Sequence, residues 1–345
     1  MLGVAARLRG TLGMMNTAEI PPELCDACRF ESRDYTNDDV LGTLRALTPW
    51  WRLIMANVAD DSLHARPSAA VWSGLEYLEH STEVTNLLAL GLEAMHAQPL
   101  VALQAQLVVP PVAKHASTRP SDAVLDEFDG ATAAFIKLAT ATSATQRHHR
   151  LTFPDGIEIN PDWIVRHAVH DAVHHLYDVA TGLRGLGAGV APHSGTVVQI
   201  NLSSGGVPKR AVAEAKIERR GLVGDRQATR VHHGRVIQAV CLASFEAIER
   251  MQAEGHPIFA GAAGENFTLA GVDWAALRPG VRMRIGDAVL ETTLPAVPCA
   301  QNAQWFADRK FNRIHHAEHP SETRWYARVV HDGSVRAGDP VRIDG

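Results

Sequence analysis

A change of hydrophobic periodicity part-way along this 345-residue chain constrains its fold most strongly. Up to about Gly182, apolar residues recur at spacings of three and four, as they do in amphipathic helices. The stretch 185–195, GLGAGVAPHSG, reads as a glycine and proline linker, and short alternating runs with frequent turns follow it. The sequence therefore predicts an α+β multidomain protein, with an N-terminal four-helix bundle followed by a mostly β, barrel-like domain.

The length of the chain is about twice that of a usual single domain, which also favours two compact units. We expect an N-terminal extension over 1–35, the bundle over 36–185, the linker over 186–194 and the β domain over 195–345. The expected long helices cover about 39–58, 69–95, 122–142 and 161–180, with Gly182 ending the last one. The expected strands are 196–202, 212–218, 236–242, 281–285 and 288–293, with short helices at about 244–254 and 300–308.

Charge and composition exclude several functional classes. The net charge of -5 and the lack of a basic patch argue against nucleic-acid binding. No stretch approaches the roughly 18 apolar residues that would cross a membrane. The first fifteen residues do not read as a secretory peptide, and Met14 or Met15 is an alternative start. Four cysteines are too few for a disulfide framework, which favours the cytoplasm. The oligomeric state is left open.

Histidines gather in the fourth expected helix. His170 and His174 are four residues apart and share one helical face, where they can bind one metal ion, whereas His175 points about 100° away. His80, in the second expected helix, shares a face with apolar residues and is expected to point into the bundle. A solvated, histidine-rich face is an equally good interpretation of the spacing alone.

Two segments support the metal-site interpretation. WSGLEYLEH at 72–80 and HAVHDAVHH at 167–175 resemble the DinB-like superfamily of four-helix metal-binding proteins, over about residues 30–183. The resemblance implies a divalent ion, such as zinc, nickel or iron, held by His80, His170 and His174.

A lone C-x-x-C motif, CDAC, occupies residues 25–28. It lacks the second pair of a closed zinc site and the βαβ context of a redox motif. We therefore interpret it as an N-terminal turn that carries two thiols.

The C-terminal half contains four segments in a characteristic order: GTVVQINLSSGGVPKRAV, GLVGDRQATRVHHGR, GENFTLAGVDW and LPAVPCAQNAQWF. Together with RWYARVVHDGSVRAGDPV they resemble the MOSC domain, a β-barrel module, over about 190–345. The resemblance implies molybdenum cofactor with Cys299 as the protein ligand of the metal. Arg235 departs from the second glycine that members often show after HHG, and this puts the local turn in doubt.

The residues themselves agree with a cofactor site. Cys299 follows Pro298 at the start of an expected helix, where the helix dipole favours the thiolate, a soft metal ligand. Cys241, inside an apolar strand, reads as a structural cysteine. Asp225 fits a turn cap as well as a catalytic role. The expected cofactor-binding residues are Lys209, Asp225, Arg226, His232, His233 and Asn266.

Three functions remain open. The MOSC resemblance implies either handling of cofactor sulfur or reduction of N-hydroxylated small molecules. Because the chain has no desulfurase domain, we favour the reductase, with electrons supplied by a separate donor protein. The alternatives are a metal- and thiol-dependent transferase or isomerase acting through the bundle, and a non-enzymatic carrier of cofactor or sulfur.

Overall fold

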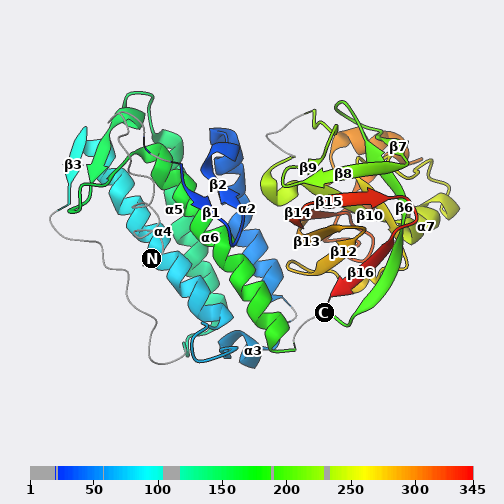
Figure 1. Cartoon of the computed structure of the whole chain (residues 1–345), viewed down its shortest axis with the longest axis horizontal. Coiled ribbons are helices and arrows are strands. Elements are labelled where there is room, and N and C mark those ends of the chain that lie inside the picture. Colours follow the sequence, from blue (N-terminus) through cyan, green and yellow to red (C-terminus); the bar gives the residue numbers. More distant parts are fainter. Residues whose placement is uncertain are drawn as a thin grey trace.

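The protein is described by a computed structural model covering residues 20, 22–56, 58–103, 117–187, 190–228 and 234–344. A helical body and a β-barrel body lie side by side, as Figure 1 shows. This arrangement confirms the predicted α+β class, with the helices first and the barrel second. Within the described ranges, no helix combines the length and the apolar character needed to cross a bilayer.

Four long helices build the first body. They are α2 (Asn37–Met55), α4 (Gly74–Ala97), α5 (Ser121–Ala141) and α6 (Pro161–Gly185), accompanied by the short helix α3 (Asp60–His64). Capping boxes begin α2 at Thr36 and α4 at Ser73, and Asn160 accepts a hydrogen bond from the Trp163 amide at the start of α6. These caps satisfy amide groups that would otherwise lack partners.

Helix α6 extends beyond its predicted end. We expected Gly182 to terminate it, but the helix runs to Gly185. A side-chain carbon at Gly182 would lie 3.1 Å from Pro67 Cγ, so this glycine permits close packing within the helix. The buried Leu183 continues the apolar face past it.

The core of the helical body consists of aromatic and aliphatic side chains from all four long helices. Each fully buried aliphatic side chain contributes about 1.5–3 kcal/mol to stability. Among the largest fully buried side chains are Trp50, Trp51, Leu75, Leu78, Phe128 and Phe135. Strands β3 (Leu100–Ala102), β4 (Arg150–Thr152) and β5 (Glu158–Ile159) form a small sheet at one end of the body.

Seven strands close the barrel. Their order is β11-β10-β14-β13-β12-β16-β6, and β11 pairs again with β6, so the sheet closes on itself. Their bounds are β6 (His193–Leu202), β10 (Val240–Ser244), β11 (Phe267–Ala270), β12 (Arg282–Ile285), β13 (Ala288–Pro295), β14 (Trp325–His331) and β16 (Pro340–Asp344). Helix α7 (Phe245–Ala253) follows β10.

Three predicted elements of the β domain differ in the structure. The expected strand 212–218 is two strands, because β7 (Arg210–Val212) pairs with β6 whereas β8 (Glu214–Glu218) pairs with β9 (Gly221–Leu222) and β15 (Gly333–Arg336). The expected strand 236–242 begins as a 3-10 turn, η4 (Val236–Gln238), before β10. The expected helix 300–308 is the shorter 3-10 segment η6 (Ala300–Trp305).

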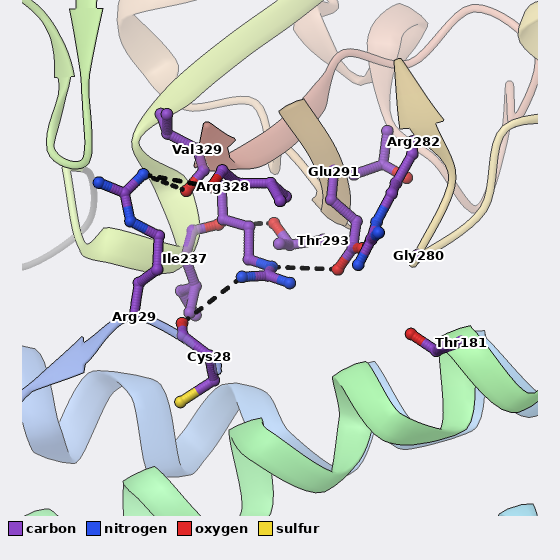
Figure 2. Close-up of polar contacts among 12 residues, drawn as sticks. Cys28, Arg29, Thr181, Ile237, Gly280, Arg282, Glu291, Thr293, Arg328 and Val329 are labelled. Carbon is purple, nitrogen blue, oxygen red and sulfur yellow. Dashed lines mark hydrogen bonds and ion pairs between the residues drawn. The ribbon is translucent and has the colours of Figure 1, made fainter. Parts of the chain in front are cut away.

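A short hairpin joins the two bodies. Strands β1 (Leu24–Cys25) and β2 (Phe30–Glu31) lie between α6 and the barrel. Arg29 donates to Asp332 at 2.9 Å and to the Val329 carbonyl at 3.3 Å. Figure 2 shows this corner, where the barrel strands face the helices across the Cys28–Arg29 backbone. The residues predicted to form a simple extension therefore take part in the domain contact.

Arg235 also belongs to this contact. Its φ of -68° is ordinary for any residue, and the positive φ of the turn falls on Gly234 instead. The buried Arg235 guanidinium lies against α2, where a side-chain carbon at Gly42 would come within 2.2 Å of Arg235 Nη2. The departure from the expected glycine thus requires no unusual backbone conformation at Arg235 and adds an interdomain contact.

Candidate metal and cofactor sites

Cys299 stands at the N-terminal end of η6, directly after Pro298 in the segment that follows β13. It is the exposed cysteine of the chain, whereas Cys28 and Cys241 are buried and Cys25 is half-buried. The Cys299 amide donates to Asn302 Oδ1 at 3.2 Å, which fixes the turn that presents the thiol. The thiol is therefore held on a short, ordered segment and open to a ligand.

The loop that contains Ala263 and Glu265, together with Arg324 just before β14, lies against this turn. Asn302 Nδ2 donates to the Ala263 carbonyl at 3.4 Å, and Arg324 Nη1 donates to the same carbonyl. Arg324 Nε and Glu265 Oε2 are buried and lack hydrogen-bond partners among the described residues. Two buried polar atoms without partners are costly unless a ligand or water satisfies them.

Glu265 is almost fully buried in this loop. Its Oε1 accepts from the Gly261 amide at 2.5 Å and from Thr268 Oγ1 at 3.3 Å. Burial raises the pKa of this carboxyl group above its ordinary value, although those hydrogen bonds act in the opposite direction.

Three predicted cofactor-binding residues form one internal network. Lys209 Nζ is paired with Asp225 Oδ2, and Asn266 Nδ2 donates to the same oxygen at 2.9 Å. Asp225 Oδ1 accepts from the Ser203 amide at 2.9 Å, while the Cys241 amide donates to Asn266 Oδ1 at 3.1 Å. The Lys209 and Asp225 side chains are 7% and 2% exposed, so each charge is neutralised by the other. This network positions the loops and leaves little charge to attract a ligand.

Of the three remaining predicted cofactor-binding residues, the structure describes one. Arg226 is exposed, and its amide donates to the Ser203 carbonyl at 2.8 Å. His232 and His233 lie outside the described residues.

The helical body holds a separate cluster of metal-binding side chains. Donor atoms of His80, Asp171 and His175 all lie within 4.8 Å of one another. His80 Nε2 is 3.9 Å and His175 Nε2 is 3.6 Å from Asp171 Oδ1. The rings of Trp72 and Tyr77 pack beside these imidazoles. Two imidazoles and one carboxylate with open positions are a common ligand set for divalent iron and related metals.

Burial and charge act against each other in this cluster. Burial favours the neutral form of His175, but the charges and hydrogen bonds of Asp171 and Asp178 together outweigh it and raise the pKa of His175 to about 9. Burial would likewise raise the pKa of Asp171, yet His175 lowers it to about 2. Burial lowers the pKa of His80, which favours the neutral imidazole that binds metals.

The predicted ligand set of His80, His170 and His174 is not brought together. Side chains on α6 rotate by about 100° per residue, so the pair 170/174 and the pair 171/175 lie on adjacent stripes of the helix. His175, with Asp171, faces His80 on α4, whereas His170 and His174 face the N-terminal hairpin. The pair expected to face His80 was His170 and His174, whereas the structure groups His80 with Asp171 and His175.

The hairpin side of α6 carries two further groups of donors. One consists of Glu23, His167 and His170, and the other of Cys25, Cys28, His170 and His174. Burial alone would raise the pKa of Glu23, but hydrogen bonds from His167 and His170 lower it to about 2. The hydrogen bond from Cys28 lowers the pKa of the Cys25 thiol. Two separate sequence signals fall in this group: the C-x-x-C motif, which we interpret as a turn that carries two thiols, and the His170/His174 spacing, which we assign to a site with His80.

Family comparisons divide the chain into the same two parts as the structure, a helical body and a β-barrel body. Residues 40–179 match the DinB superfamily, and residues 229–342 match the MOSC domain. The uncharacterized YflK protein of Bacillus subtilis (strain 168) is 30% identical over 135 residues, which is 39% of this chain and 60% of that protein. The chain thus matches less than two thirds of the length of this relative.

Several solved structures match part of the chain. YuaD from Bacillus subtilis is 16% identical, with 44% of this chain and 96% of that chain covered and a TM-score of 0.37. YiiM from Escherichia coli is 21% identical, with 44% and 70% covered and a TM-score of 0.34. YfiT from Bacillus subtilis, described as a probable metal-dependent hydrolase with an unusual four-helix bundle topology, is 12% identical, with 44% and 87% covered and a TM-score of 0.38.

Proposed function

Because this chain joins a DinB superfamily domain to a MOSC domain, we propose that it is a molybdenum-cofactor-binding oxidoreductase that reduces N-hydroxylated small molecules. MOSC domains are associated with molybdenum cofactor, and Cys299 is the residue we assign as the protein ligand of the metal. The observation that carries the proposal is the exposed Cys299 thiol, in a turn joined through the Ala263 carbonyl to Arg324. Arg324 Nε and Glu265 Oε2 are buried and have no hydrogen-bond partner among the described residues.

The donor set fits such a cofactor. A thiolate is a soft ligand that suits molybdenum better than it suits magnesium or calcium. Arg324 offers a guanidinium whose Nε has no partner among the described residues, and this group can receive an anionic part of the cofactor. A side-chain carbon at Gly206 would meet no atom within 4 Å, so the SSGG turn leaves room for a bulky ligand. The role of Lys209 and Asp225 is then to hold these loops in place.

When bound, the cofactor supplies a two-electron couple. Reduction of an N-hydroxyl group consumes two electrons and two protons and releases an amine or amidine and water. Glu265 lies in the loop that contains Ala263. Because burial raises the pKa of its carboxyl group, Glu265 is suited to retain a proton there. The sequence shows no flavin, haem or iron–sulfur motif, so we assign electron supply to a separate donor protein. A cytoplasmic location is part of the proposal, since all four cysteines are free.

The test is an activity assay on protein made in a host that synthesises molybdenum cofactor. An N-hydroxylated aromatic amidine serves as substrate and a chemically reduced viologen as electron donor. We expect Cys299→Ser to abolish turnover, because it removes the soft ligand, and Cys241→Ala to retain it, because Cys241 lies buried in β10. Equal turnover in wild type and Cys299→Ser would refute the proposal.

A second candidate function is supported by the cluster in the helical body. His80, Asp171 and His175 could hold a divalent ion for a thiol-dependent transferase or isomerase, with positions left open for thiol or water. This candidate predicts loss of thiol transfer to a small electrophile in His175→Ala but not in Cys299→Ser. Cofactor binding without either activity would instead favour a carrier.

A further inference from the structure

The N-terminal hairpin and the outer face of α6 bring together four side chains that suit a second metal. We propose that Cys25, Cys28, His170 and His174 bind one zinc ion in a closed structural site. Their donor atoms all lie within 4.8 Å of one another. Two thiolates and two imidazoles are a standard ligand set for tetrahedral structural zinc. The inference does not depend on the proposed oxidoreductase activity.

The spacing of the donors agrees with a shared ion. Zinc–sulfur and zinc–nitrogen bonds of about 2.3 and 2.0–2.1 Å at a tetrahedral angle place sulfur and nitrogen about 3.6 Å apart. Cys25 Sγ lies 3.5 Å from His174 Nδ1. The ligands can therefore take up an ion with only small side-chain adjustments.

A carboxylate lies near one ring nitrogen of each imidazole, and the other ring nitrogen is left for the metal. His170 Nδ1 is 2.7 Å from Glu23 Oε1, and its other ring nitrogen, Nε2, is buried without a hydrogen-bond partner among the described residues. His174 Nε2 lies 3.6 Å from Asp178 Oδ2, while its Nδ1 faces Cys25. Metal-binding histidines characteristically donate their other N–H to a carboxylate, which fixes the tautomer. His170 shows this arrangement, whereas the Asp178 carboxylate lies beyond hydrogen-bond distance of His174 Nε2 and pairs with His175 Nδ1 at 2.9 Å.

The surroundings of the group favour a structural rather than a catalytic role. The ring of Phe30 stacks on His170, with centroids 4.6 Å apart. Arg328 of the barrel donates to the Cys28 carbonyl at 3.5 Å. In Figure 2 the Cys28 carbonyl points to the barrel and its sulfur points to the helices. Four protein ligands leave no position for substrate, so the ion would fasten the hairpin to α6 where the two domains meet.

This site is distinct from the cluster of His80, Asp171 and His175. The two groups share no residue, and they lie on adjacent stripes of α6. Only the hairpin group contains sulfur, which gives it a separate spectroscopic signature. Zinc replaced by cobalt shows thiolate-to-metal charge-transfer bands at this site and none at the other.

The experiment uses the full chain, purified under reduction and stripped of metal, and titrates it with Co²⁺. We expect thiolate charge-transfer bands together with tetrahedral d–d bands, saturating at one equivalent and removed by one equivalent of Zn²⁺. Cys25→Ser and Cys28→Ser should each abolish the charge-transfer bands, whereas Cys299→Ser, a cysteine outside the group, should keep them.

Two results would overturn the inference. One is the absence of charge-transfer bands in the wild-type chain purified under reduction. This includes the case in which peptide mass spectrometry shows that Cys25 and Cys28 have formed a disulfide despite the reductant. The other is their full retention in Cys25→Ser and Cys28→Ser. Because the wild-type titration decides the first point alone, the test stands even if a serine variant fails to fold.

Discussion

The guanidinium carbon of Arg328, in the barrel, lies 3.4 Å from the ring centroid of Tyr177 in α6. Arg328 Nε also donates to Glu291 Oε1 at 3.0 Å, and the two side chains are 4% and 0% exposed. A desolvated arginine that faces an aromatic ring on one side and a carboxylate on the other is stabilised by both domains at once. The two bodies are therefore expected to unfold together.

Removing this arginine should destabilise the whole chain. Arg328→Ala removes the buried partner of Glu291 Oε1, although Arg282 stays paired with Glu291 Oε2 at 2.8 Å. We expect a loss of about 3–5 kcal/mol in the free energy of unfolding. Arg336→Ala is the matched control, because its pair with Glu214 has the same 3.0 Å separation but side chains that are 75% and 67% exposed. That variant should lose no more than about 1 kcal/mol. Urea denaturation measures both, and equal losses would contradict the role of Arg328.

Two helical glycines should respond oppositely to alanine. Gly130, in α5, has no atom within 4 Å of the added carbon, so Gly130→Ala should gain about 0.5–1 kcal/mol from helix propensity. Gly42→Ala must displace the buried Arg235 guanidinium and should lose that gain. In an Arg235→Ala background the Gly42→Ala gain should return. Thermal unfolding of the wild type, Gly42→Ala, Arg235→Ala and the double variant checks this. If the stability changes of Gly42→Ala and Arg235→Ala simply add in the double variant, the contact is contradicted.

The loss of folding stability at low pH should depend on Glu76. Burial would raise the pKa of this carboxyl group, but hydrogen bonds from Arg66 and Ser73 outweigh it and lower the pKa below its ordinary 4.5. Between the folded and unfolded values the unfolded chain binds more protons, so this stabilisation is present above pH 4.5 and is lost as pH falls through the folded value.

Melting curves from pH 7 to pH 3 measure this contribution. Glu76→Gln should lower the melting temperature at pH 7 and flatten its decline in acid. Glu83→Gln, an exposed position on the same helix, should follow the wild-type profile. A Glu76→Gln profile parallel to the wild type would count against the assignment.

The two cysteines of the β domain should differ in reactivity. Burial raises the pKa of Cys241 to about 11, so at pH 8 only about one molecule in a thousand carries the thiolate. Cys299 is exposed, and a limiting amount of maleimide should label it first. Peptide mass spectrometry should find Cys241 labelled only after denaturation. Comparable labelling of Cys241 in the folded protein would show that β10 is not packed as described.

The periodicity of the sequence predicted the long helices well, because amphipathic stripes and cap residues are local signals. It could not determine which stripe of α6 faces α4. His170 and His174 differ from Asp171 and His175 by a rotation of about 100°, and only packing against α4 and the hairpin selects between them. Local spacing supports either pair.

The hairpin group shows a second reason why part of the site was missed. Cys25 and His174 are 149 positions apart in the chain, and no local pattern links them. A lone C-x-x-C predicts a turn until tertiary structure supplies its partners. In the β domain, by contrast, a proline and an expected helix start flank Cys299, and the structure places this exposed cysteine at the start of η6. Only the three-dimensional structure shows that Arg324 Nε and Glu265 Oε2 are buried without a hydrogen-bond partner among the described residues.

The molybdenum content of the purified chain tests the central claim most directly. Protein from a host that makes the cofactor is analysed by mass spectrometry for molybdenum per chain, beside Cys299→Ser and His175→Ala. The account predicts nearly one molybdenum per chain in wild type and in His175→Ala, and almost none in Cys299→Ser. Wild-type protein without molybdenum, or a Cys299→Ser variant that retains it, would contradict the account.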